Sequence, residues 1–178
     1  MGAPQPFNEA ERLLSLQDFN ILDTLPEQSY DDLTQLAATI CQTPIALISF
    51  IDSYRQWFKS AAGVDIGVDE TPRDHSFCAY AIMNPGQIMV IEDATKDVRF
   101  ANNPLVTGHP YIRFYAGAPL LSDAGHALGS LCVIDTKPNR ITPTQQNALQ
   151  TLSRQVMEQL QLRHKIRKLS DKITSQTG

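Results

Sequence analysis

The sequence lacks any apolar run long enough to cross a bilayer. A membrane-spanning helix needs roughly 20 consecutive apolar residues, and no stretch of this chain approaches that length. The first residues have neither the basic start and apolar core of a secretory signal nor the Ser or Thr of a myristoylation motif. We therefore expect a soluble, cytoplasmic protein that has no membrane partner.

Cysteine is scarce, and its three positions are Cys41, Cys78 and Cys132. The number is odd, no pair forms a CxxC motif, and no cysteine has the spacing to histidine that a zinc site requires. The four histidines are not spaced as metal ligands either. Because each cysteine lies in an apolar segment, the sequence predicts buried, reduced thiols and no bound metal.

Positive charge is not in excess. The chain has 15 Lys and Arg against 19 Asp and Glu, a formal net charge of −4, whereas a nucleic-acid-binding domain usually carries a basic surface. No nucleic-acid partner is therefore expected. The basic residues that gather from Arg154 onward are interpreted as a solvated helix face, the alternative being a contact with DNA or anionic lipid. With 178 residues, 42% of them hydrophobic, the chain suits one compact domain with a helical extension.

Two capping patterns near the start of the chain predict two helices. Asn8 followed by Glu11, and Thr24 followed by Glu27, resemble capping boxes, in which side chains of the first turn bind free backbone N–H groups. Leucines follow the first box, and apolar residues at spacings of three and four follow the second. We expect a first helix at the domain edge and a second that ends before Pro44.

Short apolar runs bounded by turn residues predict the strands. The expected strands are 45–51, 57–60, 88–91, 114–121 and 128–134. A short helix over 76–83, capped by Asp74 or Ser76, separates the first two strands from the rest, and the irregular stretch 95–109 is long enough to suggest a functional loop. Because consecutive strands are joined by short turns, the sheet is expected to be antiparallel and the fold class α+β.

The last segment predicts one long helix, because it opens with Thr142 and Gln145 in a capping pattern and contains no Gly or Pro before Gly178. Its apolar stripe consists of Leu149, Leu152, Val156 and Leu160, followed by Leu162, Ile166, Leu169 and Ile173. The second set has the spacing of a coiled-coil seam, and the change of phase between the sets resembles a stutter. A seam that leaves its own domain needs a partner helix.

Eight segments spread in order over residues 12–165 resemble the GAF family, and specifically the bacterial subgroup found in sensor kinases and cyclic-dinucleotide signalling proteins. They are Ile21-Leu-Asp-Thr-Leu-Pro26, Arg55-Gln-Trp-Phe-Lys59, Glu70-Thr-Pro-Arg73, Ser76-Phe-Cys-Ala79, Asp97-Val-Arg-Phe100, Asn103-Pro-Leu-Val106, Ile112-Arg-Phe-Tyr-Ala-Gly-Ala-Pro119 and Leu128-Gly-Ser-Leu-Cys-Val-Ile-Asp135. Each segment is short, and their order and even spread make the resemblance specific.

The resemblance implies a central antiparallel sheet with the N- and C-terminal helices on one face and a ligand pocket under a loop and a short helix on the other. It further implies a sensory domain over residues 1–160, a signalling-helix extension over 161–178 and a homodimer formed through the terminal helices. The output partner would be a histidine kinase or a diguanylate cyclase or phosphodiesterase domain. We expect a regulatory domain rather than an enzyme, either as a fragment of a longer chain or acting in trans.

On the fold that the resemblance implies, eight residues are expected to line the pocket. They are Trp57, Phe77, Cys78, Arg99, Phe100, Asn103, Arg113 and Tyr115. Two arginines beside the start of a short helix favour a small anionic metabolite as the ligand. Alternatively, both arginines pin an irregular loop through nearby acids, and the aromatic residues belong to the core.

Other functions of similar folds lack their characteristic residues here. Free methionine sulfoxide reductases share the fold, and Cys78 stands near one of their cysteines, but their catalytic cysteine belongs on a loop that is represented here by residues 97–115, which contain none. Bilin-binding members use a cysteine on the same loop, so no bilin is expected, and the signature of cyclic-nucleotide binders is absent. A further alternative is a dimerisation scaffold whose pocket is filled by its own side chains, which an enclosed cavity would argue against.

Overall fold

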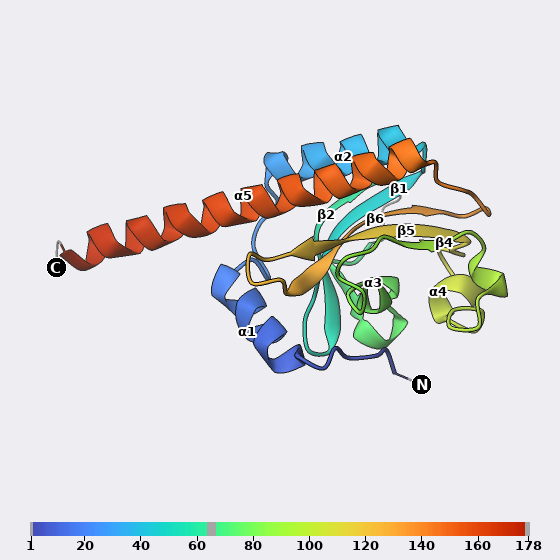
Figure 1. The fold of residues 1–178 in the computed structure, drawn as a ribbon, viewed down its shortest axis with the longest axis horizontal. Coiled ribbons are helices and arrows are strands. Elements are labelled where there is room, and N and C mark those ends of the chain that lie inside the picture. The colour runs from blue at the N-terminus through green and yellow to red at the C-terminus, as the bar shows by residue number, and fades with distance from the viewer. Residues whose placement is uncertain (1, 64–66, 177–178) are drawn as a thin grey trace.

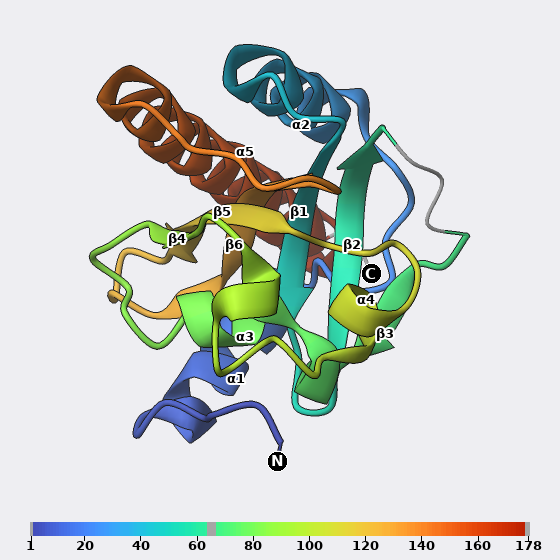
Figure 2. The same ribbon diagram turned by 90° about the vertical axis from the view of Figure 1, so that its right-hand side faces the viewer.

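The computed structural model describes residues 2–63 and 67–176, which form three layers. The central layer is a six-stranded antiparallel sheet with the order β3-β2-β1-β6-β5-β4. Helices α2 (Gln28–Cys41) and α5 (Pro143–Gln176) cover one face, and the short helices α3 (Phe77–Ala81) and α4 (Pro104–Thr107) lie on the other (Figures 1 and 2). The α+β class and the antiparallel sheet predicted from the sequence are confirmed.

Two hairpins supply the four long strands. The first joins β1 (Ile45–Ile51) to β2 (Arg55–Ala62), and the second joins β5 (Phe114–Leu121) to β6 (Ala127–Asp135). β1 and β6 lie side by side at the centre, and every residue of both strands is buried. The short strand β4 (Met89–Ile91) pairs with β5 at one edge.

One strand was not predicted. β3 (Glu70–Pro72) pairs with β2 at the other edge, within a segment for which the sequence predicted no strand. A strand of three residues, one of them proline, has too little alternation to be distinguished from a loop by pattern.

The prediction of two capping boxes near the N-terminus was wrong, although both helices form. α1 (Glu9–Phe19) begins after Asn8, whose side chain makes no capping bond and lies 3.4 Å from a ring nitrogen of His126. α2 begins after Glu27 rather than Thr24, because the Thr24 hydroxyl donates to the carbonyl of Ile21 at 2.6 Å instead of capping a helix. Both caps depend on tertiary contacts or local turns that the motif does not reveal.

The caps of the other helices follow the sequence more closely. Ser76 caps α3, accepting a hydrogen bond from the Ala79 N–H at 3.0 Å. In α5, the Gln145 N–H donates to the Thr142 hydroxyl at 3.1 Å, and the Thr142 N–H donates back to the Gln145 side chain at 3.0 Å. This reciprocal pair is the predicted capping box.

The two apolar sets on α5 have different surroundings. Leu149, Leu152, Val156 and Leu160 are buried against the sheet and α2. The helix then extends past the body of the domain (Figure 1), and Leu162, Ile166, Leu169 and Ile173 are between 51% and 66% exposed. No described helix is long and apolar enough to cross a membrane.

The sheet separates two hydrophobic cores because successive strand side chains point to opposite faces. In β1, Ile48 and Phe50 face the α2 and α5 layer, which we call the helix face, and this core also receives Leu16 and Phe19 from α1. Leu47 of the same strand faces α3 and α4, which we call the pocket face.

Candidate functional site

A cavity of about 200 Å³ lies on the pocket face, between the sheet and the segment that carries α4. Strands β1, β2, β5 and β6 contribute its base, with Thr71 from the edge strand β3, while α3 forms one wall and residues 105–112 close it from the other side. The lining residues are Ile45, Leu47, Gln56, Phe58, Val68, Thr71, Phe77, Cys78, Leu105, His109, Pro110, Ile112, Tyr115, Cys132 and Ile134. This face of the sheet is therefore not completely filled by its own side chains.

The lining is mainly apolar. None of the described residues that line the cavity is Lys, Arg, Asp or Glu, and the polar side chains at its margin are Gln56, Thr71 and His109. The Gln56 side chain is partly occupied, because its carbonyl oxygen accepts a hydrogen bond from the Ser76 hydroxyl. A ligand here would meet hydrocarbon, aromatic rings and sulfur, with few groups to orient it.

Aromatic stacking fixes one wall of the cavity. Phe77 of α3 stacks on Phe100, with ring centroids 4.0 Å apart and planes inclined by 7°. Phe100 belongs to the segment between β4 and β5, residues 92–113, which we call the loop. Tyr80 meets the same Phe100 ring edge-on at 4.9 Å. This contact ties α3 to the loop, so a displacement of either element is expected to move the other.

A buried polar cluster lies at the base of the cavity. The Ser49 and Tyr115 hydroxyls each donate to Cys78 Sγ at 3.2 Å, and Tyr115 also contacts the Ser130 hydroxyl at 3.2 Å. Gly117 leaves room for this arrangement, since a Cβ at that position would overlap the Tyr115 hydroxyl. The cluster satisfies polar groups that would otherwise be buried without partners.

The cluster changes the acidity of its members in opposite directions. Burial raises the pKa of the Cys78 thiol, but hydrogen bonds with Cys132, Ser49 and Tyr115 outweigh burial and lower it to about 7. Burial, together with the neighbouring Cys78 and Cys132, raises the pKa of Tyr115 well above its usual value. Cys78 is therefore the acidic member, and Tyr115 remains a neutral donor.

Trp57 does not lie in the cavity, contrary to its predicted position. It pairs in register with Phe50, and the two rings stack at 6.4 Å within the core of the helix face. Its neighbours Gln56 and Phe58 point to the cavity instead. The direction of a strand side chain depends on pairing register, which the sequence alone did not provide.

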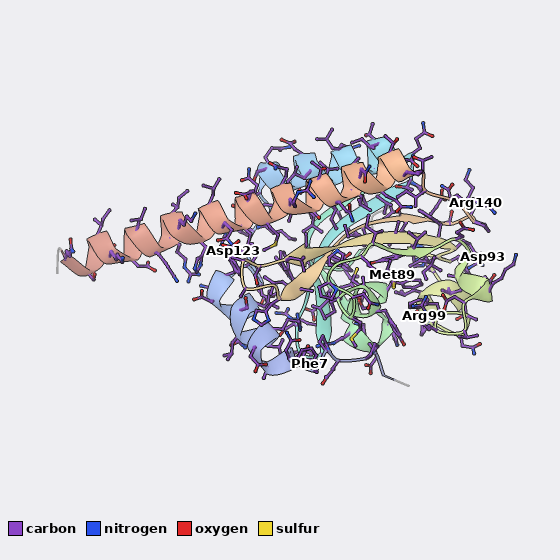
Figure 3. The ribbon with its side chains drawn as sticks, in the orientation of Figure 1. Phe7, Met89, Asp93, Arg99, Asp123 and Arg140 are labelled. Carbon is purple, nitrogen blue, oxygen red and sulfur yellow. The ribbon has the colours of Figure 1, made fainter. Side chains whose placement is uncertain are left out.

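The predicted polar residues lie around the cavity rather than in it. Arg99 projects from the loop near α4 (Figure 3) and forms a two-point contact with Asp97, with its Nε and Nη2 at 2.9 and 2.6 Å from the carboxylate oxygens. The Arg113 guanidinium donates to the carbonyls of Val106 and Ile112 at 2.9 and 3.0 Å. Both arginines therefore hold the loop in place.

Asn103 and Phe100 do not line the cavity either, but they contact the elements that form it. The Asn103 side chain caps α4 by accepting from the Leu105 N–H at 2.9 Å and donates to the His75 carbonyl at 3.1 Å. Phe100 is fully buried behind Phe77. Of the eight predicted residues, the structure thus places Phe77, Cys78 and Tyr115 on the cavity wall.

Comparison with known proteins identifies the fold. The family model described as the GAF domain matches residues 25–160. The chain belongs to the GAF domain family.

This GAF domain has a relative that fits cyclic-dinucleotide signalling. It is 47% identical over 135 residues to a cyclic di-GMP phosphodiesterase of Pseudomonas aeruginosa. The match covers 76% of the present chain but 22% of that protein. The relative is therefore much longer than the chain described.

Solved structures similar to the GAF domain share its architecture at low sequence identity. The GAF domain of an Acinetobacter phosphoenolpyruvate-protein phosphotransferase has a TM-score of 0.65 and 18% identity, covering 91% of this chain and 98% of that one. A type II free methionine-R-sulfoxide reductase from Thermoplasma acidophilum has a TM-score of 0.61 and 12% identity, covering 82% and 94%. At these identities the likeness shows the fold alone.

Several cavity residues of the GAF domain were missed from the sequence. Leu47, Cys132 and Ile134 lie on the pocket face because they alternate with helix-face residues along β1 and β6. Alternation along the strands was a usable signal. Tyr115 was expected on the pocket face, and Ile134, its partner across the β5–β6 ladder, points to the same face. The pairing register and the fold of residues 105–112 were needed to bring the whole set together.

Two further features of the GAF domain bear on its chemistry. Among the described residues, no group of three or more His, Cys, Asp or Glu side chains is arranged to hold a metal ion. A larger groove of about 450 Å³ lies between β5 and α5, lined by side chains that include Gln150, Arg154 and Glu158. The smaller cavity has the more apolar lining and is backed by the sheet, so it offers more burial to a small molecule.

Proposed function

We propose that this GAF domain is a sensory module that binds a small, largely apolar and uncharged molecule in the cavity of the pocket face. The observation that carries the proposal is the lining itself, which is apolar and includes no permanently charged side chain among its described members. A cavity of about 200 Å³ suits a small aromatic or short aliphatic compound with one or two polar groups.

An uncharged ligand is preferred over the anion expected from the sequence. Moving an unpaired charge into an apolar site costs several kcal/mol unless an opposite charge or several donors compensate it. Arg99 is engaged with Asp97, and Arg113 is engaged with backbone carbonyls. Neither arginine is among the lining residues, so the structure supports the alternative in which both of them pin the loop.

Strand β2 offers a route from the cavity to the helix face. A register shift lies beside Phe58, where Ser49 pairs with Phe58 but the preceding Ile48 pairs with Ser60, so Lys59 is an extra residue. Phe58 lines the cavity, while Lys59 extends to the other side and binds a Glu27 carboxylate oxygen at 2.6 Å. A ligand that displaces Phe58 is therefore expected to shift Lys59.

The same Glu27 oxygen connects β2 to the output helix. Arg163 of α5 binds it at 3.2 Å and also donates to the Asn20 carbonyl at 3.3 Å. These contacts lie where α5 leaves the domain, immediately after the buried Leu160. We call Lys59, Glu27 and Arg163 the latch. In the proposed mechanism, ligand binding changes the packing of the loop and β2, and the latch transmits the change to α5.

The exposed apolar seam of α5, formed by Leu162, Ile166, Leu169 and Ile173, is the surface through which the domain would contact a partner. We propose that a second copy of the chain packs against it to form a homodimer and that the paired helices bias an output domain. The phosphodiesterase relative makes a domain of cyclic-dinucleotide metabolism the preferred output, and a histidine kinase is the other candidate. The effect on the output can be no larger than the difference in ligand affinity between the two arrangements.

A regulatory role is proposed in preference to a catalytic one. The reductase alternative requires a reactive thiol on the loop that precedes β5, and residues 97–113 contain no cysteine. Cys78 and Cys132 instead lie at the base of the cavity, and Cys41 lies in the core of the helix face. The scaffold alternative requires a filled pocket face, which the cavity argues against.

Matched small probes test the proposed ligand class. Benzyl alcohol, benzoate and benzylamine share a ring and differ in charge, so the shift of the melting temperature with each should separate uncharged from anionic recognition. We expect benzyl alcohol to raise the melting temperature of the wild type and the charged probes to raise it less. Native mass spectrometry of the purified protein would then identify any retained metabolite.

Two sets of variants serve as controls. Leu47→Phe and Ile134→Phe fill the cavity from different strands and should abolish the response to benzyl alcohol, provided that circular dichroism shows a folded protein. The double variant Arg99→Ala/Arg113→Ala should retain the response. A strong response to benzoate that disappears in the arginine variant would overturn the proposal and restore the anionic ligand.

A further inference from the structure

Two of the three cysteines meet at the base of the cavity. Cys78 lies on α3 and Cys132 on β6, separated by 54 positions in the sequence, and their sulfur atoms are 3.8 Å apart. Both side chains line the cavity. The fold therefore brings together two thiols that neither a sequence motif nor the ligand-sensing role explains.

From this geometry we infer that Cys78 and Cys132 form a redox-active pair, with Cys78 as the thiol that reacts with a small hydroperoxide and Cys132 as the thiol that closes a reversible disulfide. The inference is independent of the ligand class proposed above, because it concerns covalent chemistry of the cavity wall. It assigns a modification site to residues that otherwise serve as packing.

The surroundings of the two sulfurs make them unequal. Cys78 Sγ accepts hydrogen bonds from two hydroxyl groups, and such donors stabilise a thiolate even in a buried position. Cys132 has the opposite character, since its hydrogen bond to Cys78 and its burial both raise its pKa. Cys78 is thus the thiol that more readily forms a nucleophilic thiolate, while Cys132 stays protonated until Cys78 has been oxidised.

The chemistry balances with a hydroperoxide as the oxidant. Cys78 loses its thiol proton, and the thiolate attacks the terminal peroxide oxygen. The O–O bond breaks, the terminal OH stays on Cys78 as a sulfenic acid, and the remaining alkoxide takes up the released proton and leaves as an alcohol, or as water from hydrogen peroxide. Cys132 then attacks the sulfenic sulfur, an S–S bond forms, and the hydroxyl leaves as water after taking the Cys132 proton. Two thiols lose two electrons, and one peroxide gains them.

Only a small movement is needed to form the bond. A disulfide holds its sulfurs about 2.05 Å apart, so the present 3.8 Å must shorten by roughly 1.8 Å through side-chain rotation and a small shift of α3. α3 carries Phe77, which stacks on Phe100 of the loop. Oxidation is therefore expected to change the position of the same loop that closes the cavity.

Cys41 is a matched control within the same chain. It is also buried, but it lies in the core of the helix face, and burial raises its pKa to about 11. If burial alone decided reactivity, all three thiols would be inert. The proposal requires Cys78 of the native protein to react at least about tenfold faster than Cys41.

The test is peroxide treatment of the native full chain followed by mass spectrometry. In the wild type and in Cys41→Ser, we expect an unreduced digest to contain a peptide pair linked through Cys78 and Cys132, which dithiothreitol removes. In Cys132→Ser, dimedone should trap a sulfenic acid at Cys78. In Cys78→Ser, the linked pair should be absent, and Cys132 should stay reduced under the same exposure.

Two results would overturn the inference. One is oxidation of Cys78 no faster than that of Cys41 in the folded protein, which would show that the cluster does not activate the thiol. The other is oxidation of Cys78 to sulfinic acid in the wild type without the linked pair, which would show that Cys132 does not reach it. Near-ultraviolet circular dichroism of each variant confirms that the comparison is made on folded protein.

Discussion

The two faces of the central sheet differ in how completely they are filled. On the helix face, strand side chains such as Ile48, Phe50 and Leu131 pack against α2 and α5 in a continuous core. On the pocket face, α3 and the loop leave a cavity of about 200 Å³, with thiols and hydroxyls at its base. Both faces are built from the same strands by alternation of side chains.

This difference in packing indicates that the two faces of the sheet have different roles. Close packing favours stability, whereas a cavity forfeits dispersion contacts and leaves room for a ligand. The latch joins the two faces, because it begins beside Phe58 in the cavity and ends on α5.

The helix face should be the more sensitive to lost volume. Leu131→Ala removes a fully buried side chain from a central strand and should lower the free energy of unfolding by about 3 to 4 kcal/mol. Leu47→Ala, on the adjacent central strand, enlarges an existing cavity and should cost only about 2 kcal/mol, because part of that side chain already faces empty space. Chemical denaturation measures both, and equal losses would remove the contrast.

The latch should contribute less than the core but more than a surface ion pair. Glu27→Gln leaves the buried Lys59 ammonium without its anionic partner and should destabilise the fold by about 1 to 2 kcal/mol, a value reduced by the partial exposure of Glu27. Glu92→Gln, at a pair with Arg140 in which both side chains are exposed, is the control and should change stability by less than about 0.5 kcal/mol. Similar losses in the two variants would show that the latch is an ordinary surface contact.

The latch should also weaken in acid. Burial raises the pKa of Glu27, but the hydrogen bond and charge of Lys59 and the charge of Arg163 outweigh it, so the folded-state pKa lies below the usual 4.5. A lowered pKa means that the stabilisation is fully present above the unfolded-state value and is lost as the pH falls through the folded-state value. Denaturation curves at several pH values should show the difference between wild type and Glu27→Gln shrinking below about pH 4.5. If the stability difference between wild type and Glu27→Gln did not change with pH, the contribution of the latch would not depend on the ionisation of Glu27.

The exposed seam should show the smallest effect on stability and a clear effect on assembly. Ile166→Ala/Leu169→Ala alters side chains that are 66% and 61% exposed, so unfolding of the monomer should change by less than about 0.5 kcal/mol. Analytical ultracentrifugation at high micromolar concentration should find a dimer for the wild type and a monomer for the variant. Asp171→Ala, outside the seam on the same helix, should remain dimeric. A monomeric wild type with residues 142–178 intact would exclude dimerisation through α5.

Much of the fold follows from short-range patterns. The order of the long strands and main helices and the antiparallel sheet are predicted correctly, and of the two caps expected for α3, Asp74 or Ser76, the structure has Ser76. The reciprocal cap between Thr142 and Gln145 is the clearest case, since both hydrogen bonds lie within one helical turn. Such features depend on residues a few positions apart, so the sequence shows them directly.

The candidate site was predicted less well. Phe77, Cys78 and Tyr115 lie on the cavity wall, but Trp57 belongs to the opposite core and the two arginines hold the loop. A one-residue change of register sends a strand side chain to the other face, and nothing near Trp57 in the sequence specifies its pairing with Phe50. Arginine partners depend on the path of the loop.

By itself, the sequence determined the class of fold, the family and the long terminal helix with its apolar seam. Only the tertiary structure decided which side chains share the cavity, how Lys59 reaches Glu27 on the far side of the sheet, and that Cys78 meets Cys132. The physical reason is the range of the interactions. Caps and periodicity arise within a turn or a strand, whereas the cavity arises from contacts between segments far apart in the sequence, and the two cysteines that meet in it are separated by 54 positions.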